Sequence, residues 1–424
     1  MKKNKYRWIA SAILTLALAA CTGPAIEAPT EQPVDSLPTE PVVPTDTPPP
    51  TPTSDPFPDP TLKIVGEEEI VFDWTNDRCQ EENIPDLAAR AFRDATGQVQ
   101  LIISHAVNYR MLGPDLNNLK VDCNPIMISK HDPDPSHYTD AQWIAAPYTE
   151  DGQTIYALVH NEYQGHTHPG QCPQNDYFPC WDNSITLAVS TDSGQTYTEA
   201  MEPPSHLVAR FPYPYKAGAG PEGFRAPSNI IQGQDGFYYN FFNVSEYGTQ
   251  KQWVCLMRTD DLSAPDSWRF WDGTAFEGQF ADPYVDDIGD PNEHICPHID
   301  QVGNTSESLS ESITYNTYLK RYVLVGISDD WLEDREVWGF YYSFSEDLIN
   351  WTHRKLLLET ELPWTVETPG SDVSHLYPTL LDPDSESRNF ETMDKTAYLY
   401  FTRNNFGHAS LDRDLIRVPV EFFP

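Results

Sequence analysis

Polar and ionisable residues recur beside the apolar segments of this sequence, at places that correspond from one segment to the next. The apolar segments come in successive pairs. Some of these polar residues stand where the first segment of a pair begins: Asp86, Arg225, Glu311, His375 and Tyr377. Others stand where a second apolar segment ends: His105, His160, Glu162, Asn243 and Arg403. Carboxyl and imidazole groups often transfer protons, and charged groups are rarely buried without partners. The pattern predicts either one shared site with acid–base chemistry or polar loops whose charges pair with one another.

The elements that must position these residues read as short strands. Five segments each show a strand, a polar turn and a stronger strand: residues 88–105, 143–160, 226–243, 311–328 and 376–403. They are rich in Val, Ile, Tyr, Phe and Trp and are separated by Gly, Asp, Asn and Pro, which is typical of strands and turns. Helical periodicity is nearly absent after the first twenty residues.

A third strand follows each hairpin, and in four copies it runs into a polar turn and then an aromatic residue. The copy at 190–197, "STDSGQTY", resembles the Asp-box of sialidase-type propellers, and residues 345–351 are a relaxed version. A short Asp side chain in such a turn can accept hydrogen bonds from backbone amides while the aromatic ring packs on the sheet. We therefore expect these turns to be structural.

Repeated small sheets that cannot bury their own faces must pack around something, which favours an all-β fold: a five-bladed β-propeller of antiparallel four-stranded blades over residues 62–424. Residues 67–74 are expected to add an outer strand to the last blade and so close the ring. First strands would begin, and second strands end, at one mouth of that ring, where the polar residues would meet. A β-sandwich or two jelly-roll domains is the alternative.

The N-terminus has the pattern of an export signal over residues 1–20, with four basic residues, an apolar run from Trp8 to Leu18 and small residues before Cys21. The run is too short for a convincing membrane span. Residues 18–21 resemble a bacterial lipobox, which implies that Cys21 is modified with a lipid whose acyl chains include palmitate. An ordinary secretory signal is the alternative. Residues 21–61 are rich in Pro and Thr and predict a disordered tether. We expect a cell-envelope protein, lipid-anchored and facing the extracytoplasmic side.

Charge and cysteine content narrow the classes further. A net charge of −37 argues against binding of nucleic acid and disfavours polyanionic glycans as ligands, so neutral glycans are the more favourable partners. We expect the protein to be a monomer. Six cysteines remain after Cys21, and an even count in an exported chain favours disulfides, with Cys172–Cys180 as the first choice. A zinc site is the alternative use of these cysteines.

The residues at the predicted mouth resemble those of the five-bladed propeller glycosidases, the superfamily of glycoside hydrolase families 43 and 32. "Pro85-Asp86" is similar to the blade-one aspartate, which implies a base or nucleophile at Asp86. "Arg225-Ala226-Pro227" is similar to the blade-three Glu-Ala-Pro of family 43 or the Arg-Asp-Pro of family 32, with one carboxylate missing by either comparison. An acid must then come from elsewhere, and we favour Glu162, with Glu222 and Glu311 as substitutes.

The resemblance implies an exported glycosidase that acts on a neutral furanoside or pyranoside at the axial mouth. The alternatives are a glycan-binding lipoprotein without catalysis and a structural or metal-binding periplasmic protein. The remaining polar residues would form the substrate-binding wall: His105, His160, His166, His168, Glu222, Arg225, Asn243, His375, Tyr377 and Arg403. Arg225 and Arg403 would bind sugar hydroxyls or orient Asp86.

Two clusters suggest metals, although no cofactor is certain and the metal ligands stay unknown. The histidines at 160, 166 and 168 could ligate a transition metal, and we favour a role in hydrogen bonding to substrate over that role. Residues 282–290 have the carboxylate density that suits calcium but lack the regular spacing of a calcium loop.

Overall fold

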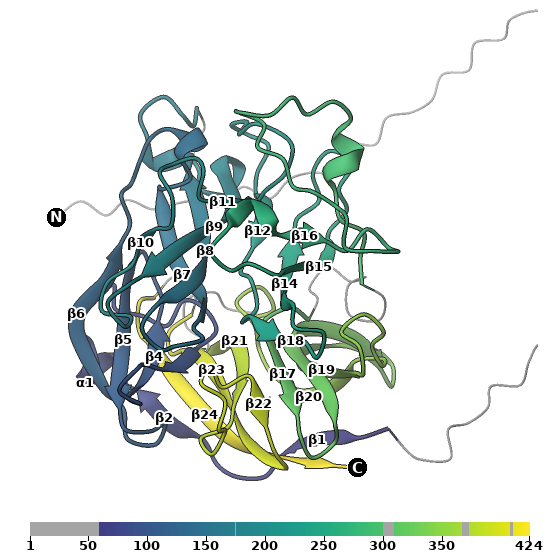
Figure 1. Cartoon of the computed structure of the whole chain (residues 1–424). Coiled ribbons are helices and arrows are strands. Elements are labelled where there is room, and N and C mark those ends of the chain that lie inside the picture. The colour runs from purple at the N-terminus through teal and green to yellow at the C-terminus, as the bar shows by residue number, and fades with distance from the viewer. Residues whose placement is uncertain (1–58, 174, 300–308, 367–372, 408–409) are drawn as a thin grey trace, which may run out of the picture. The chain divides into compact units, whose positions relative to one another are not determined.

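Short antiparallel strands form nearly all of the regular structure in this computed structural model (Figure 1). The structure describes residues 59–173, 175–299, 309–366, 373–407 and 410–424, all within one unit that spans Phe57–Pro424. The export signal, Cys21 and nearly all of the tether lie outside the described residues. Within those ranges, no helix has the length and apolarity that crossing a membrane requires.

The strands pair into antiparallel meanders that follow the chain. The first sheet is β3 (Arg90–Arg93), β4 (Val99–Ile103), β5 (Val107–Gly113) and β6 (Lys120–Ile128). The second is β7 (Ala141–Tyr148), β8 (Ile155–Gln164) and β9 (Trp181–Ser190), with β10 (Thr198–Glu199) and β11 (Leu207–Ala209) on the outer side of β9. The third is β12 (Glu222–Arg225) with β13 (Ile231–Gln232), then β14 (Tyr238–Val244), β15 (Trp253–Thr259) and β16 (Arg269–Phe270).

The fourth sheet is β17 (Ser312–Asn316), β18 (Arg321–Leu332), β19 (Arg335–Ser345) and β20 (Lys355–Glu359). The fifth is β21 (Ser374–Leu381), β23 (Thr396–Asn404) and β24 (Arg413–Phe423), to which β1 (Thr61–Ile64) and β2 (Glu69–Phe72) both pair. Short parallel pairings join neighbours: β12 with β9, and β22 (Thr392–Met393) with β17. Helices are short: α1 (Trp74–Asp77), η1 (Pro135–His137), η2 (Gly165–Thr167), η3 (Phe178–Cys180), η4 (Pro265–Ser267) and η5 (Pro291–His294).

Five hydrophobic clusters lie between consecutive sheets, and together they close a ring. The first and second sheets share one cluster, as do the second and third, the third and fourth, and the fourth and fifth. The remaining cluster joins the fifth sheet to the first. Adjacent residues of one strand serve different clusters, as Phe241 and Phe242 of β14 do. Because side chains alternate between faces, a strand buried on both faces reads as a continuous apolar run. The predicted all-β propeller of antiparallel sheets is confirmed.

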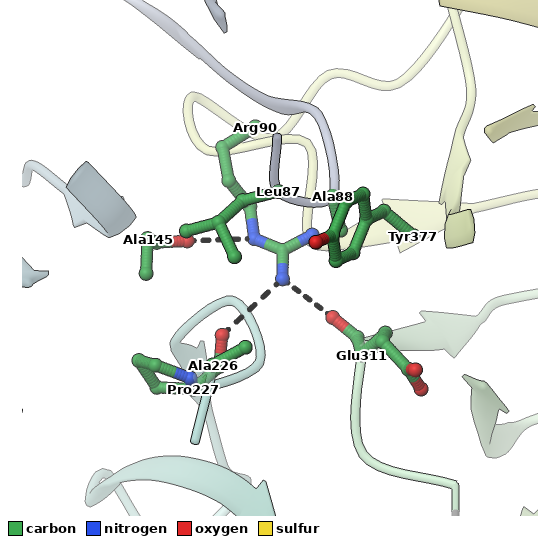
Figure 2. A pocket seen from close by; sticks show the side chains of 8 residues that line it. All are labelled: Leu87, Ala88, Arg90, Ala145, Ala226, Pro227, Glu311 and Tyr377. Carbon is green, nitrogen blue, oxygen red and sulfur yellow. Dashed lines mark hydrogen bonds between the residues drawn. The ribbon is translucent and has the colours of Figure 1, made fainter. Parts of the chain in front are cut away.

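The ring also has a central clasp, the guanidinium of Arg90 (Figure 2). This fully buried side chain donates to the carbonyl oxygen of Ala145 at 2.9 Å, of Pro227 at 3.4 Å and of Glu311 at 2.5 Å, and to Thr379 Oγ1 at 3.2 Å. These acceptors belong to the first-strand regions of the second, third, fourth and fifth sheets, and Arg90 itself begins β3 of the first. One side chain therefore contacts all five sheets at the axis.

Local details agree with the turn chemistry expected above. Asp192 accepts hydrogen bonds from the Thr196 N–H at 2.9 Å and from the Thr196 hydroxyl at 2.7 Å, and Tyr197 is buried. Two expectations need correction. The sheets are not uniformly four-stranded, and the first strand of the third sheet is broken into β12 and β13, so that Arg225 ends a strand instead of beginning one. Pro227 lies in that break and has no N–H to donate.

Candidate functional site

A cavity of about 420 Å³ lies among residues of the second to fifth sheets and of the segment that leads into the first, Asp86 and Leu87. That size is within the range of small-ligand sites. Its polar lining includes most of the residues that the sequence placed at the mouth: Asp86, His160, Glu162, Arg225, Asn243, Glu311 and Tyr377. Its apolar lining includes Trp143, Phe178, Trp181, Ala226, Ile327, Trp364 and Leu376. The ring therefore brings these distant parts of the chain to one place.

The Asp86 carboxylate lies at the cavity with charged and polar partners. Its backbone N–H donates to the Ser104 carbonyl at 3.0 Å, which fixes the residue at the end of β4. Arg413, at the start of β24, forms an ion pair with Oδ1, and the Tyr377 hydroxyl donates to the same oxygen at 3.3 Å. His105 Nε2 lies 3.9 Å from Oδ2. A carboxylate held by arginine and hydroxyl donors is kept ionised and oriented.

Tyr377 owes its position to a break in the β21–β23 ladder. The register shifts between Leu376 and Thr379, and Tyr377 has φ of 60°, which is rare for a residue with a large side chain. Burial and the charge of Asp86 raise the pKa of Tyr377 well above its ordinary value, so its hydroxyl stays protonated and donates. Backbone strain of this kind is common at functional sites.

Glu162 is the second cavity carboxylate and is almost fully buried. Its Oε1 lies 3.1 Å from His160 Nε2, and its Oε2 accepts from Gln164 at 2.8 Å and from the Tyr177 hydroxyl at 3.1 Å. His160 Nδ1 is buried without a hydrogen-bond partner. His160 and Glu162 therefore form a buried, hydrogen-bonded pair at the cavity.

The charges of Asp86 and Glu162 raise the pKa values of the same two tyrosines, Tyr177 and Tyr377. Besides its burial, the pKa of Tyr177 is raised by the charge of Glu162, its hydrogen-bond partner, and then by that of Asp86. Tyr377 feels the charge of Glu162 in addition to that of Asp86. Asp86 and Glu162 therefore face one region of the cavity, with a tyrosine hydroxyl on each.

Glu311 lines the cavity in a different way. Its Oε2 accepts the Ile327 N–H at 3.1 Å and the Ser310 N–H at 3.3 Å. The carboxylate lies over Gly326, where an added Cβ would be 2.1 Å from Oε2. Its main-chain oxygen accepts from Arg90. These contacts fit a floor residue that ties the fourth sheet to the axis.

Aromatic rings form much of the remaining wall. Trp181 stacks on Tyr177 with ring centroids 5.0 Å apart, and the Arg225 guanidinium lies 5.7 Å from the Trp181 ring. Phe178 and Trp364 are 58% and 50% exposed, which is high for such large apolar side chains. Apolar walls with few, well-placed polar groups are typical of ligand sites.

Six residues expected at the mouth do not line the cavity: His105, His166, His168, Glu222, His375 and Arg403. His166 packs against Tyr177 with ring centroids 5.2 Å apart, and His168 pairs with Asp140 at 3.0 Å. His375 Nδ1 lies 2.5 Å from the Thr360 hydroxyl, and Arg403 pairs with Asp414 and Glu68. His105 contacts Asp86 without lining the cavity.

The metal alternatives find no support in the residues described. Those residues contain no group of three or more His, Cys, Asp or Glu side chains placed to hold a metal ion. In the 282–290 segment, Asp282 Oδ1 accepts from the Tyr138 hydroxyl at 2.6 Å and Asp286 accepts from the Asp282 N–H at 2.8 Å. The cysteines form Cys79–Cys123, Cys172–Cys180 and Cys255–Cys296, so the predicted disulfides are confirmed.

Sequence reasoning missed Trp143, Tyr177, Trp181, Trp364 and Arg413. For two of them a signal existed. In an antiparallel meander the third strand begins at the mouth where the second ends, and Trp181 and Arg413 are the first residues of β9 and β24. Counting third-strand starts together with second-strand ends would have found both.

No protein-family model and no curated protein matches the chain. Solved structures do. A glycosyl hydrolase from Bacteroides ovatus is 11% identical with a TM-score of 0.44, over 85% of this chain and 93% of that chain. An endo-arabinase from Bacteroides thetaiotaomicron is 11% identical with a TM-score of 0.43, over 83% and 97%. A family 43 glycoside hydrolase from Bacillus licheniformis is 14% identical with a TM-score of 0.41, over 79% and 72%. Each likeness concerns the fold alone.

Proposed function

We propose that this protein is a glycoside hydrolase that cleaves a glycan in the axial cavity, with Asp86 and Glu162 as its two working carboxyl groups. The observation that carries the proposal is the placement of both carboxylates on one aromatic-walled cavity, each bonded to a tyrosine that also feels the charge of the other. Hydrolysis of a glycosidic bond usually needs two such groups, one to protonate the leaving oxygen and one to attack or to activate water.

The partners of each carboxylate suggest its role. Asp86, held ionised by Arg413, would act as the nucleophile or as the base toward water. Glu162 would act as the general acid: its carboxyl form gives a proton to the leaving oxygen while His160 orients the group, and the resulting carboxylate takes a proton back from the attacking water or from solvent. Glu311, bonded to backbone amides, would hold the floor. The net charge of −37 favours a glycan that carries few negative charges.

The location of this activity is also a proposal. The apolar N-terminal run, the residues before Cys21 and the Pro-rich segment support an exported protein that is lipid-anchored in the cell envelope through Cys21. Such a tether would let the hydrolase domain reach glycans outside the membrane. Labelling of the full chain with a radioactive fatty acid, and loss of the label in Cys21→Ser, would test the anchor.

The catalytic proposal is tested by turnover together with binding. Wild type and Asp86→Asn are assayed against a panel of aryl glycosides and polysaccharides. D86N is expected to lower kcat by at least about 100-fold, because general acid–base groups contribute that much or more, while the Kd for the glycan stays within about threefold. Asp272→Asn, in an exposed turn, is the matched control and should keep full activity. Turnover by D86N at the wild-type rate would refute the assignment.

A glycan-binding protein without catalysis is the second candidate. The close ion pair between Asp86 and Arg413 favours it, because an arginine partner makes a carboxylate a weaker base and nucleophile. This candidate predicts that wild type binds a glycan from the same panel but releases no sugar from any of them.

A further inference from the structure

Arg225 differs from the other arginines in its contacts. It is the last residue of β12, it lines the cavity, and its guanidinium lies 5.7 Å from the Trp181 ring. Its Nε is buried without a hydrogen-bond partner. Each of the other arginines in the described ranges has a hydrogen bond or an ion pair, for example Arg210 with Asp182 and Arg413 with Asp86. Arg225 alone among them has neither.

This absence is unexpected in so acidic a chain. The sequence has 64 acidic residues against 27 Lys and Arg, so a carboxylate partner is easily supplied. The nearby cavity carboxylates are instead bonded to other groups, Asp86 to Arg413 and Glu162 to Tyr177 and Gln164. A cation on a partly buried, aromatic-walled surface loses hydration and gains no counter-charge. The fold therefore keeps one positive charge available at the cavity.

We propose that Arg225 binds a carboxylate on the substrate, so that the sugar beside it is an acidic one on an otherwise neutral glycan. This inference rests on the proposed glycan site and names its substrate class. The guanidinium presents a planar fork of donors that matches the two oxygens of a carboxylate, and the Trp181 ring nearby favours one orientation of that fork. A single carboxylate agrees with the acidic surface, which disfavours polyanions and tolerates one charge.

The test compares matched sugars that differ in one group. Binding of glucuronate against glucose, of galacturonate against galactose, and of glucose 6-sulfate is measured by titration calorimetry at low and at high salt. Wild type is expected to bind at least one acid about ten- to hundredfold tighter than its neutral partner, since a charge-assisted hydrogen bond accounts for that ratio. High salt should reduce the preference. Equal affinity for every pair would overturn the inference, as would a preference for the sulfate alone.

Variants locate the effect. Arg225→Gln should remove the preference for the acid over its neutral partner, whereas Arg225→Lys should keep part of the preference because it keeps the charge without the fork. Arg321→Gln, the same charge change at a residue that pairs with Glu346 away from the cavity, should behave as wild type. Near-ultraviolet circular dichroism identifies any variant that has lost its fold. A preference that survives in R225Q refutes the role of Arg225.

Binding and turnover separate the two proposals. A preference for the acidic sugar without turnover of any glycan would refute the proposed hydrolase activity and support the proposed carboxylate site at Arg225. Turnover that depends on Asp86, without any preference for acidic over neutral sugars, would support the hydrolase activity and refute the carboxylate site at Arg225.

Discussion

Two buried glutamates show how much the partners of a side chain decide. Glu162 is bonded to His160, Gln164 and Tyr177 at the cavity. Glu222, in β12, is as deeply buried, but its Oε2 has no hydrogen-bond partner, and burial together with the charge of Asp182 raises its pKa to about 8. Glu222 is therefore a carboxylic acid at neutral pH. The sequence predicted that it would line the cavity, but it does not.

The raised pKa predicts a pH dependence of stability. Between its ordinary value of 4.5 and about 8, folded Glu222 keeps a proton that the unfolded chain releases, so its contribution to the free energy of unfolding falls as pH rises through that window. Glu222→Gln removes this contribution. We expect E222Q to gain stability relative to wild type steadily from pH 5 to pH 8, as measured by urea unfolding at several pH values.

The control for this prediction is Asp192→Asn. Burial would raise the pKa of Asp192, but hydrogen bonds from Thr196 and Ser190 outweigh it and lower the pKa below its ordinary 3.8. The stability that Asp192 contributes is present above that value and is lost as pH falls. The difference between D192N and wild type should stay constant from pH 5 to pH 8. Parallel curves for E222Q and wild type would show that Glu222 is ionised in the folded state.

At the scale of elements, one connection shapes a whole side of the cavity. The segment between β8 and β9 contains η2, the Cys172–Cys180 disulfide and η3, and it carries Tyr177 and Phe178. Tyr177 donates to Glu162 and stacks on Trp181. The connection thus joins the acid of one strand to the aromatic wall of the next, and the disulfide restrains it.

Removing that disulfide should weaken glycan binding as well as lower stability. Cys172→Ser with Cys180→Ser opens a loop of 8 residues, which is expected to cost about 2.5 kcal/mol of unfolding free energy by loop entropy and to lower glycan affinity at least about tenfold. Cys79→Ser with Cys123→Ser, across 44 residues and with neither cysteine in the cavity lining, should cost more stability, about 4 kcal/mol, and leave affinity unchanged. Unfolding curves and titrations measure both. Equal affinity in the two double variants would contradict this role.

The whole molecule depends on closure of the ring. Five inter-sheet clusters bury both faces of most strands, and β1 and β2 from the start of the domain pair with β24 at its end. At the centre, Arg90 contacts the first strands of the other sheets. Burial lowers its pKa to about 9, and the carbonyl oxygens around it still leave it positively charged at neutral pH. The axis of the ring therefore contains a buried cation.

Loss of this clasp should destabilise the protein strongly. Arg90→Met leaves buried carbonyl oxygens of three sheets without a donor, and we expect a loss of about 3 to 5 kcal/mol in the free energy of unfolding. Arg93→Met is the control, since Arg93 also donates to two carbonyls but is partly exposed and bridges fewer sheets; about 1 kcal/mol is expected there. Losses of the same size in guanidinium unfolding would show that Arg90 has no special place at the axis.

The sequence by itself determined what is local or periodic. Apolar runs and turn residues predicted the hairpins, the Asp-box turns fixed the third strands, and the short spacing of Cys172 and Cys180 predicted their bridge. The sequence did not determine the register in which neighbouring strands pair. His375 and Tyr377, two apart on β21, should share a face, but the bulge separates them, so that Tyr377 contacts Asp86 while His375 contacts Thr360.

Only the tertiary structure decided which polar groups meet. Strand ends predicted a list of residues for the mouth, but the list could not say which side chains face inward, because one residue of slip turns a side chain to the opposite face. Partners such as Arg413 for Asp86 and Tyr177 for Glu162 come from segments far apart in the chain or from a loop without periodicity. The ionisation and the roles of the carboxylates depend on those partners, and closure of the ring is what supplies them.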